Sequence, residues 1–125
     1  MNRLETKDEQ LNRSIMRSSF VDARALADAV VRQQVQAMDM DVRDAIERIG
    51  VRISESSPYI VQCAQKHVDE LDDRYFDADE KGDLNESARF FRAARLVSAC
   101  LFLMKAASNS DLSEAAYEAL SSMDG

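Results

Sequence analysis

Residues 57–107 read SPYIVQCAQKHVDELDDRYFDADEKGDLNESARFFRAARLVSACLFLMKAA and predict two long helices joined by a short turn. Ser57 followed by Pro58 is typical of a helix start. Serine can cap the free N–H groups of the first turn, and a proline at the first position has no N–H to satisfy. Apolar or half-apolar residues then recur at steps of three and four, namely Ile60, Ala64, His67, Val68, Leu71 and Tyr75. The first helix is therefore expected over residues 58–79.

The turn between the two helices is centred on Gly82. Glycine tolerates the left-handed backbone conformation that commonly follows a helix. Asp83 can cap the next helix, with Glu86 three residues later as in a capping box. The second helix is expected over residues 84–107, with apolar positions at Leu84, Ala88, Phe91, Ala94, Leu96, Val97 and Leu101. From Leu96 onward it is apolar nearly all round, which indicates a central position in the fold or a contact with another subunit.

The first half of the chain has less distinct helix boundaries. Ser19 can cap a helix, and an apolar seam follows along residues 19–53, which would span roughly 50 Å as one helix. The alternative is a break near Asp41, which could cap a second piece. Residues 4–17 are expected to form an earlier helix, and Ser110 is expected to cap a last short one.

Length and composition predict one all-α domain spanning residues 1–125. The chain contains three Gly and one Pro, so few residues disfavour helices. We expect a bundle of four to five helices around a central antiparallel hairpin, with residues 1–18 loosely attached.

Several cellular settings and partners are disfavoured by the same composition. No stretch is apolar enough to cross a membrane, and the first ten residues, MNRLETKDEQ, do not resemble a signal peptide. The expected location is therefore the cytoplasm. A pI near 4.7 argues against nucleic acid as the partner, because phosphate contacts need a basic surface.

One segment, residues 69–86, carries a net charge equal to that of the whole chain. It contains nine acids and two bases, which gives −7, and the formal net charge of the chain is also −7. The acids close to the turn are the candidate partner-binding residues, namely Asp77, Asp79, Glu80 and Asp83. Three of them precede the turn, where the helix dipole disfavours negative charge, so local helix stability does not explain them.

Three arginines of the second helix offer a purely structural explanation for part of this acidity. If the chain reverses symmetrically about Gly82, three residue pairs face each other: Arg89 with Tyr75, Arg92 with Asp72, and Arg95 with Asp69. Each exposed ion pair would contribute only about 0–1 kcal/mol. Together they would favour the antiparallel register of the two helices.

The turn also resembles two known motifs. Asp77, Asp79 and Gly82 match the start of an EF-hand loop, but Lys81 and Ala88 occupy two positions where that loop needs calcium ligands. The stretch KGDLNESARFFRAA resembles the hairpin of a tetratricopeptide repeat. As a single unit, it implies a tightly packed helical hairpin and no peptide-binding array.

The enzymatic alternative is a divalent-metal-dependent, all-helical nucleotide pyrophosphohydrolase. Asp44 with Glu47, and Glu70 with Asp73, form DxxE and ExxD pairs that resemble the ExxE and ExxD pairs of MazG-type enzymes. Acids at positions i and i+3 share one helix face, so two such pairs could hold Mg²⁺ against a triphosphate. The first acid departs from the family pattern.

The two cysteines and the single histidine form a second possible metal set. Cys63 and His67 are four residues apart on one helix, and Cys100 could approach them from the next helix. A CxxC pair, which is typical of zinc sites, is missing, so we expect reduced core thiols and no metal.

The sequence therefore favours a non-enzymatic protein-interaction module without cofactors, such as a small acidic regulator, an inhibitor or immunity-type protein, an adaptor or a chaperone. Its expected partner is a protein, and the acidic face 69–86 favours a basic one that binds there. The long seam 19–53 and the apolar segment 96–107 further predict a homodimer.

Overall fold

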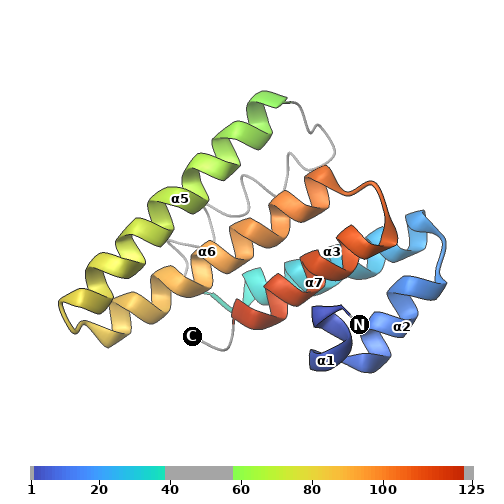
Figure 1. The fold of residues 1–125 in the computed structure, drawn as a ribbon, viewed down its shortest axis with the longest axis horizontal. Coiled ribbons are helices and arrows are strands. Elements are labelled where there is room, and N and C mark those ends of the chain that lie inside the picture. Colours follow the sequence, from blue (N-terminus) through green and yellow to red (C-terminus); the bar gives the residue numbers. More distant parts are fainter. Residues whose placement is uncertain (1, 39–57, 123–125) are drawn as a thin grey trace.

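The computed structural model describes residues 2–38 and 58–122 of this protein, and Figure 1 shows their arrangement. Six α-helices are described: α1 (Arg3–Lys7), α2 (Glu9–Arg17), α3 (Phe20–Gln36), α5 (Pro58–Glu80), α6 (Leu84–Lys105) and α7 (Asn109–Ser121). The prediction of an all-α bundle with a central antiparallel hairpin is confirmed. Within the described ranges, no helix is long and apolar enough to cross a membrane.

Helices α5 and α6 form the predicted hairpin, with ends within two residues of those expected. Gly82 has a φ of +75°, and is the only described residue in the left-handed region. The side chain of Asp83 accepts a hydrogen bond from the N–H of Glu86 at 3.1 Å, so it caps α6. The predicted turn at Gly82 and the predicted cap at Asp83 are therefore both confirmed, whereas the predicted cap at Ser57 lies outside the described residues.

The register of the hairpin differs from the predicted one by two to three residues. Arg95 pairs with Asp72, at 3.4 Å, instead of Asp69, and Tyr75 faces Phe91 instead of Arg89, with ring centroids 5.7 Å apart. The direction of helical side chains explains this shift, because every side chain leans toward the N-terminus of its own helix. In α6 that direction points toward the turn, so a long arginine reaches a residue nearer the turn than its Cα position suggests.

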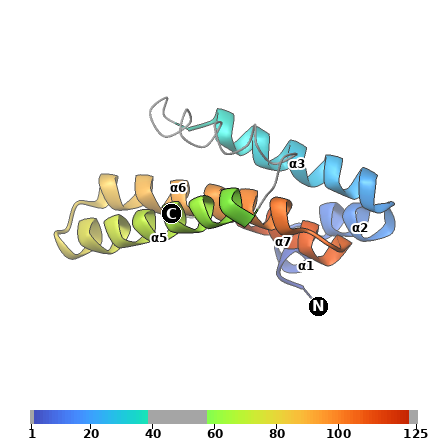
Figure 2. The same ribbon diagram turned by 90° about the horizontal axis from the view of Figure 1, so that it is seen from above.

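Helix α6 lies at the centre of the hydrophobic core. It packs against α5 along one side, α7 along another and α3 on a third. Figure 2 shows α5, α6 and α7 in one layer, with α3 in a second layer above them. Between residues 96 and 104, most side chains are buried within the chain itself, namely Leu96, Val97, Ala99, Cys100, Leu101, Leu103 and Met104. The all-round apolar character of this segment is thus accounted for by packing inside one subunit.

Helix α7 starts earlier than predicted, because Ser108 rather than Ser110 caps it. The Ser108 hydroxyl accepts a hydrogen bond from the N–H of Asp111, and the Asp111 carboxylate accepts one from the N–H of Ala107 at 2.9 Å. This arrangement resembles a capping box, although the carboxylate accepts from the N–H of Ala107 and not from that of the capping residue, Ser108. A serine two residues further on lacks an acid at the matching position. The face that α7 turns to the core carries small residues: Ser113, Ala115, Ala116 and Ala119.

The expected helix 4–17 is in fact two helices, which meet at Asp8. The backbone of Asp8 is extended (φ −150°, ψ 91°), and its carboxylate accepts a hydrogen bond from the N–H of Leu11 at 3.0 Å. A short acidic side chain that can cap a helix competes with helix continuation, which explains the break. Leu4 of α1 and Ile15 of α2 are fully buried, so both helices contribute to the core.

Helix α3 begins as predicted, with the Ser19 hydroxyl accepting a hydrogen bond from the N–H of Asp22 at 3.2 Å. A strict four-residue repeat of buried positions follows: Ala23, Ala27, Val31 and Val35. The helix ends at Gln36, inside the predicted seam 19–53. Residues 39–53 of that seam, including the possible break at Asp41, lie outside the described residues.

Candidate functional site

The distal end of the α5–α6 hairpin, residues 72–86, is the candidate functional site and is called the hairpin tip below. It extends past α3 and α7 in both views (Figures 1 and 2). The tip projects because α5 and α6 are longer than α3 and α7, which pack only near the other end of the hairpin. Most of its side chains are exposed, with Ala78 buried and Asp72, Tyr75 and Glu86 partly exposed.

The four acids predicted to bind a partner all lie at the hairpin tip and are all exposed. One carboxylate oxygen of Asp83 accepts the hydrogen bond that caps α6, and Asp77 forms an ion pair with Lys81 at 3.8 Å. Asp79 and Glu80 form no ion pair within the part of the chain that the structure describes. They stand at the C-terminal end of α5, where the helix dipole already makes the potential negative.

The tip remains acidic after its internal ion pairs are counted. Seven acids and two bases lie between residues 72 and 86, a net charge of −5. Arg95 neutralises Asp72, and Arg89 contacts Glu86 at 3.5 Å. Arg95 thus bridges the two helices with a different acid from the predicted one, whereas the Arg89 contact with Glu86 lies within α6. The acids nearest the turn keep their charge.

Two large apolar side chains lie among these acids, and the sequence did not identify either of them as a candidate binding residue. Phe76 is 64% exposed, and Leu84 is 73% exposed. Leu84 was expected on the apolar stripe of α6, but it is the first residue of that helix and extends beyond the end of α5's buried stripe. Phe76 lies next to Tyr75, and their rings are 5.3 Å apart. Since Phe76 is off the stripe formed by Ala64, Val68 and Leu71, helix periodicity could have revealed its exposure.

The metal-dependent alternatives gain no ligand cluster from the structure. Among the described residues, no three His, Cys, Asp or Glu side chains are grouped closely enough to hold a metal ion. Glu70 and Asp73 are exposed on α5, and the other acid pair, Asp44 and Glu47, lies outside the described residues.

The two cysteines differ in their surroundings. Cys100 is buried as predicted, whereas Cys63 is exposed, contrary to the expectation of a core thiol. Cys63 precedes Ala64, which lies on the buried stripe of α5, and so it is rotated about 100° away from the core. Burial raises the pKa of Cys100 from its ordinary value of 9.0 to about 12; Asp28 adds to this rise, and Arg32 opposes it.

We predict that a thiol reagent such as Ellman's reagent labels one cysteine, Cys63, in the folded protein and labels Cys100 only after denaturation. Thiolate is the reactive form, and both burial and a raised pKa suppress it at Cys100. A Cys63→Ser variant should therefore show almost no fast labelling, whereas Cys100→Ser should keep the fast phase. Rapid labelling of Cys63→Ser under native conditions would contradict this assignment.

The raised pKa also sets a pH dependence of stability. An unfolded chain loses the Cys100 proton near pH 9, but the folded chain keeps it until about pH 12. The protonated Cys100 thiol therefore makes its full contribution to folding stability below pH 9. This contribution is lost as the pH rises from 9 to about 12. Denaturant unfolding between pH 8 and pH 11 should show a smaller loss of stability in Cys100→Ser than in the wild type.

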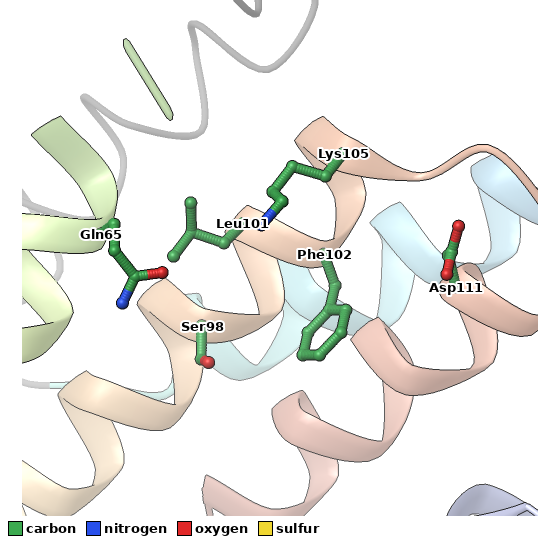
Figure 3. A pocket seen from close by; sticks show the side chains of 6 residues that line it. All are labelled: Gln65, Ser98, Leu101, Phe102, Lys105 and Asp111. Atoms are coloured by element: carbon green, nitrogen blue, oxygen red, sulfur yellow. The ribbon is translucent and has the colours of Figure 1, made fainter. Parts of the chain in front are cut away.

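Two surface grooves that are lined by described residues lie elsewhere on the molecule. One, with a volume of about 260 Å³, lies between α5, α6 and the start of α7 (Figure 3). Its lining mixes apolar and polar side chains: Gln65, Ser98, Leu101, Phe102, Lys105 and Asp111. The other, of about 400 Å³, is lined by Arg3, Thr6, Lys7 and Tyr117, and Arg3 stacks over the Tyr117 ring at 4.3 Å.

The chain was compared with protein-family models, curated proteins and solved structures, and none of them matches it. The functional argument therefore rests on the geometry of the hairpin tip.

Proposed function

We propose that this protein is a non-enzymatic protein-interaction module that uses the hairpin tip to bind a basic, partly apolar segment of a partner protein. The observation that carries this proposal is the mixture of side chains at one projecting end. Exposed Phe76 and Leu84 lie near Asp79 and Glu80, which form no ion pair among the described residues, whereas Arg89 and Arg95 pair with Glu86 and Asp72. Regulators, inhibitors, adaptors and chaperones all work by such contacts.

The two kinds of side chain would have different roles in binding. The acids raise the rate of encounter with a basic surface and select against acidic partners. Phe76 and Leu84 would supply the affinity, because apolar anchors that become fully desolvated dominate the energetics of most interfaces. A solvated, purely charged tip would need only the acids, and the exposure of two large apolar groups there favours a docking role.

The proposal predicts that neutralising the acids weakens partner capture without unfolding the protein. A triple variant, Asp77→Asn, Asp79→Asn and Glu80→Gln, should capture its partner at least about tenfold less strongly. All three side chains are exposed, so the helical circular dichroism should not change. The measurement is affinity capture from the native host with quantitative mass spectrometry, followed by titration of the purified partner.

A matched control separates the tip from net charge. Ala29→Lys, Gln33→Lys and Gln36→Lys raise the net charge by the same three units on exposed positions of α3, away from the tip. This control should bind like the wild type. A Phe76→Ser, Leu84→Ser variant, which leaves the net charge unchanged, should also lose binding, because it removes the two apolar anchors. Capture that is equal in all four proteins would refute the proposed function.

A further inference from the structure

Among the described residues, five of the seven large apolar side chains that are exposed lie at two ends of the molecule, and the other two are Leu26 and Tyr59. Phe76 and Leu84 lie at the hairpin tip. Met16, Phe20 and Val21 are exposed at the connection between α2 and α3, and Val21 is 76% exposed. We call residues 13–24, RSIMRSSFVDAR, the α2–α3 corner. Figures 1 and 2 show this corner at the opposite end of the molecule from the hairpin tip.

The charge of the corner is opposite to that of the tip. The corner contains three arginines and one acid, a net charge of +2, whereas the tip carries −5. Two of these arginines have partners in the same chain: Arg13 pairs with Glu9 at 3.0 Å, and Arg24 donates to the Leu103 carbonyl at 2.9 Å. Arg17 is exposed and pairs with no acid in residues 2–38 or 58–122, so its charge is available to a partner.

We propose that the partner of the hairpin tip is a second copy of this chain, which the tip contacts at the α2–α3 corner. The inference rests on the proposed function, since it uses the same tip. Both surfaces combine exposed apolar side chains with charge, and their charges are complementary, which is the pattern that a polar-rimmed interface requires. Each subunit carries one tip and one corner, so two antiparallel copies make the contact twice and form a closed pair.

This contact replaces the basis on which a dimer was first expected. Segment 96–107 supplied half of that expectation, and most of its apolar side chains are occupied inside the subunit. The tip and the corner, in contrast, are exposed at opposite ends of one chain. A contact between two different surfaces also makes a distinctive prediction. A subunit with a defective tip can still pair through its intact corner with a subunit whose tip is intact.

The test compares self-association of the wild type with that of two surface variants by light scattering and sedimentation. The tip variant is Asp77→Asn, Asp79→Asn, Glu80→Gln, and the corner variant is Arg17→Glu, Val21→Ser. We expect the wild type to form dimers at micromolar concentration and about 0.05 M salt, and to dissociate at about 0.5 M salt. Each variant alone should dissociate at least about tenfold more readily, and the α3 lysine control should behave like the wild type.

Mixing the two variants is the decisive measurement. The tip variant still has an intact corner and the corner variant an intact tip, so an equimolar mixture should form a heterodimer that neither variant forms alone. Unchanged circular dichroism will show that both variants are folded. A wild type that stays monomeric at low salt, a corner variant that dimerises normally, or a mixture without heterodimer would overturn the inference.

These outcomes are separable from failure of the proposed function. If the tip variant loses capture of a host protein while self-association is unaffected in every variant, the self-contact is wrong and the proposed function stands. If the tip variant captures host proteins normally and the variants self-associate normally, both proposals fail together.

Discussion

Replacing Leu96 with alanine is expected to lower the free energy of unfolding by about 3–4 kcal/mol. Leu96 is fully buried at the middle of α6, the helix that packs against α5, α7 and α3. The substitution removes apolar contacts and leaves a cavity that three packed helices cannot easily collapse. A domain of this size has a total stability of about 5–15 kcal/mol, so the loss is a large fraction of it.

Leu84→Ala is the matched control for this prediction, because it makes the same change in the same helix at a position that is mostly exposed. It should change stability by less than about 0.5 kcal/mol. Urea unfolding followed by circular dichroism gives both values. If Leu96→Ala were no more harmful than Leu84→Ala, α6 could not be the central helix of the core.

The hairpin was predictable because its determinants are local. Gly82 needs only its own backbone freedom to end α5, and Asp83 needs only a neighbouring N–H group to cap α6. The same locality explains the correct start of α3 at Ser19. Such boundaries depend on residues within a single turn, and these can be read from the chain in order.

The predicted helix boundaries were wrong where two nearby residues could both cap a helix, or where packing against distant helices determines the boundary. Ser108 and Ser110 can both cap a helix. The choice depends on Asp111, which donates its N–H to the Ser108 hydroxyl and accepts from the N–H of Ala107. Asp8 could continue a helix or start a new one, and the burial of Leu4 and Ile15 accompanies the break. Periodicity alone cannot rank such alternatives, because it does not contain the three-dimensional contacts.

For the candidate site, the sequence was informative about charge and less informative about shape. It located Asp77, Asp79, Glu80 and Asp83 at a turn, and the structure places all four there, exposed. It did not show that the tip projects from the bundle or that Leu84 is exposed, because both depend on how far the other helices reach. Outside the candidate site, the sequence did not reveal the role of Glu118 of α7, which pairs with Arg95 of α6 and Arg3 of α1.

Glu118→Gln is expected to destabilise the protein by about 2 kcal/mol, because one buried carboxylate serves two arginines. The Glu118 side chain is only 7% exposed and accepts from Arg95 of α6 at 3.3 Å and from Arg3 of α1 at 3.4 Å. Arg95 also contacts Asp72 of α5, so this chain of charges links α1, α7, α6 and α5. Glutamine keeps the size of the side chain but supplies only one neutral acceptor oxygen, so it cannot neutralise either guanidinium.

Glu114→Gln provides the comparison, since Glu114 also pairs with Arg3 but is more exposed and has no contact with Arg95. It should cost less than about 1 kcal/mol, as exposed pairs usually do. A double-mutant cycle between Glu118→Gln and Arg95→Met should then give a coupling energy of about 1 kcal/mol or more, which additive surface charges would not show. The Glu118 effect should also persist at high salt, because burial limits screening. Equal effects of the two glutamine variants, together with an additive cycle, would mean that α7 is held to the hairpin by apolar packing alone.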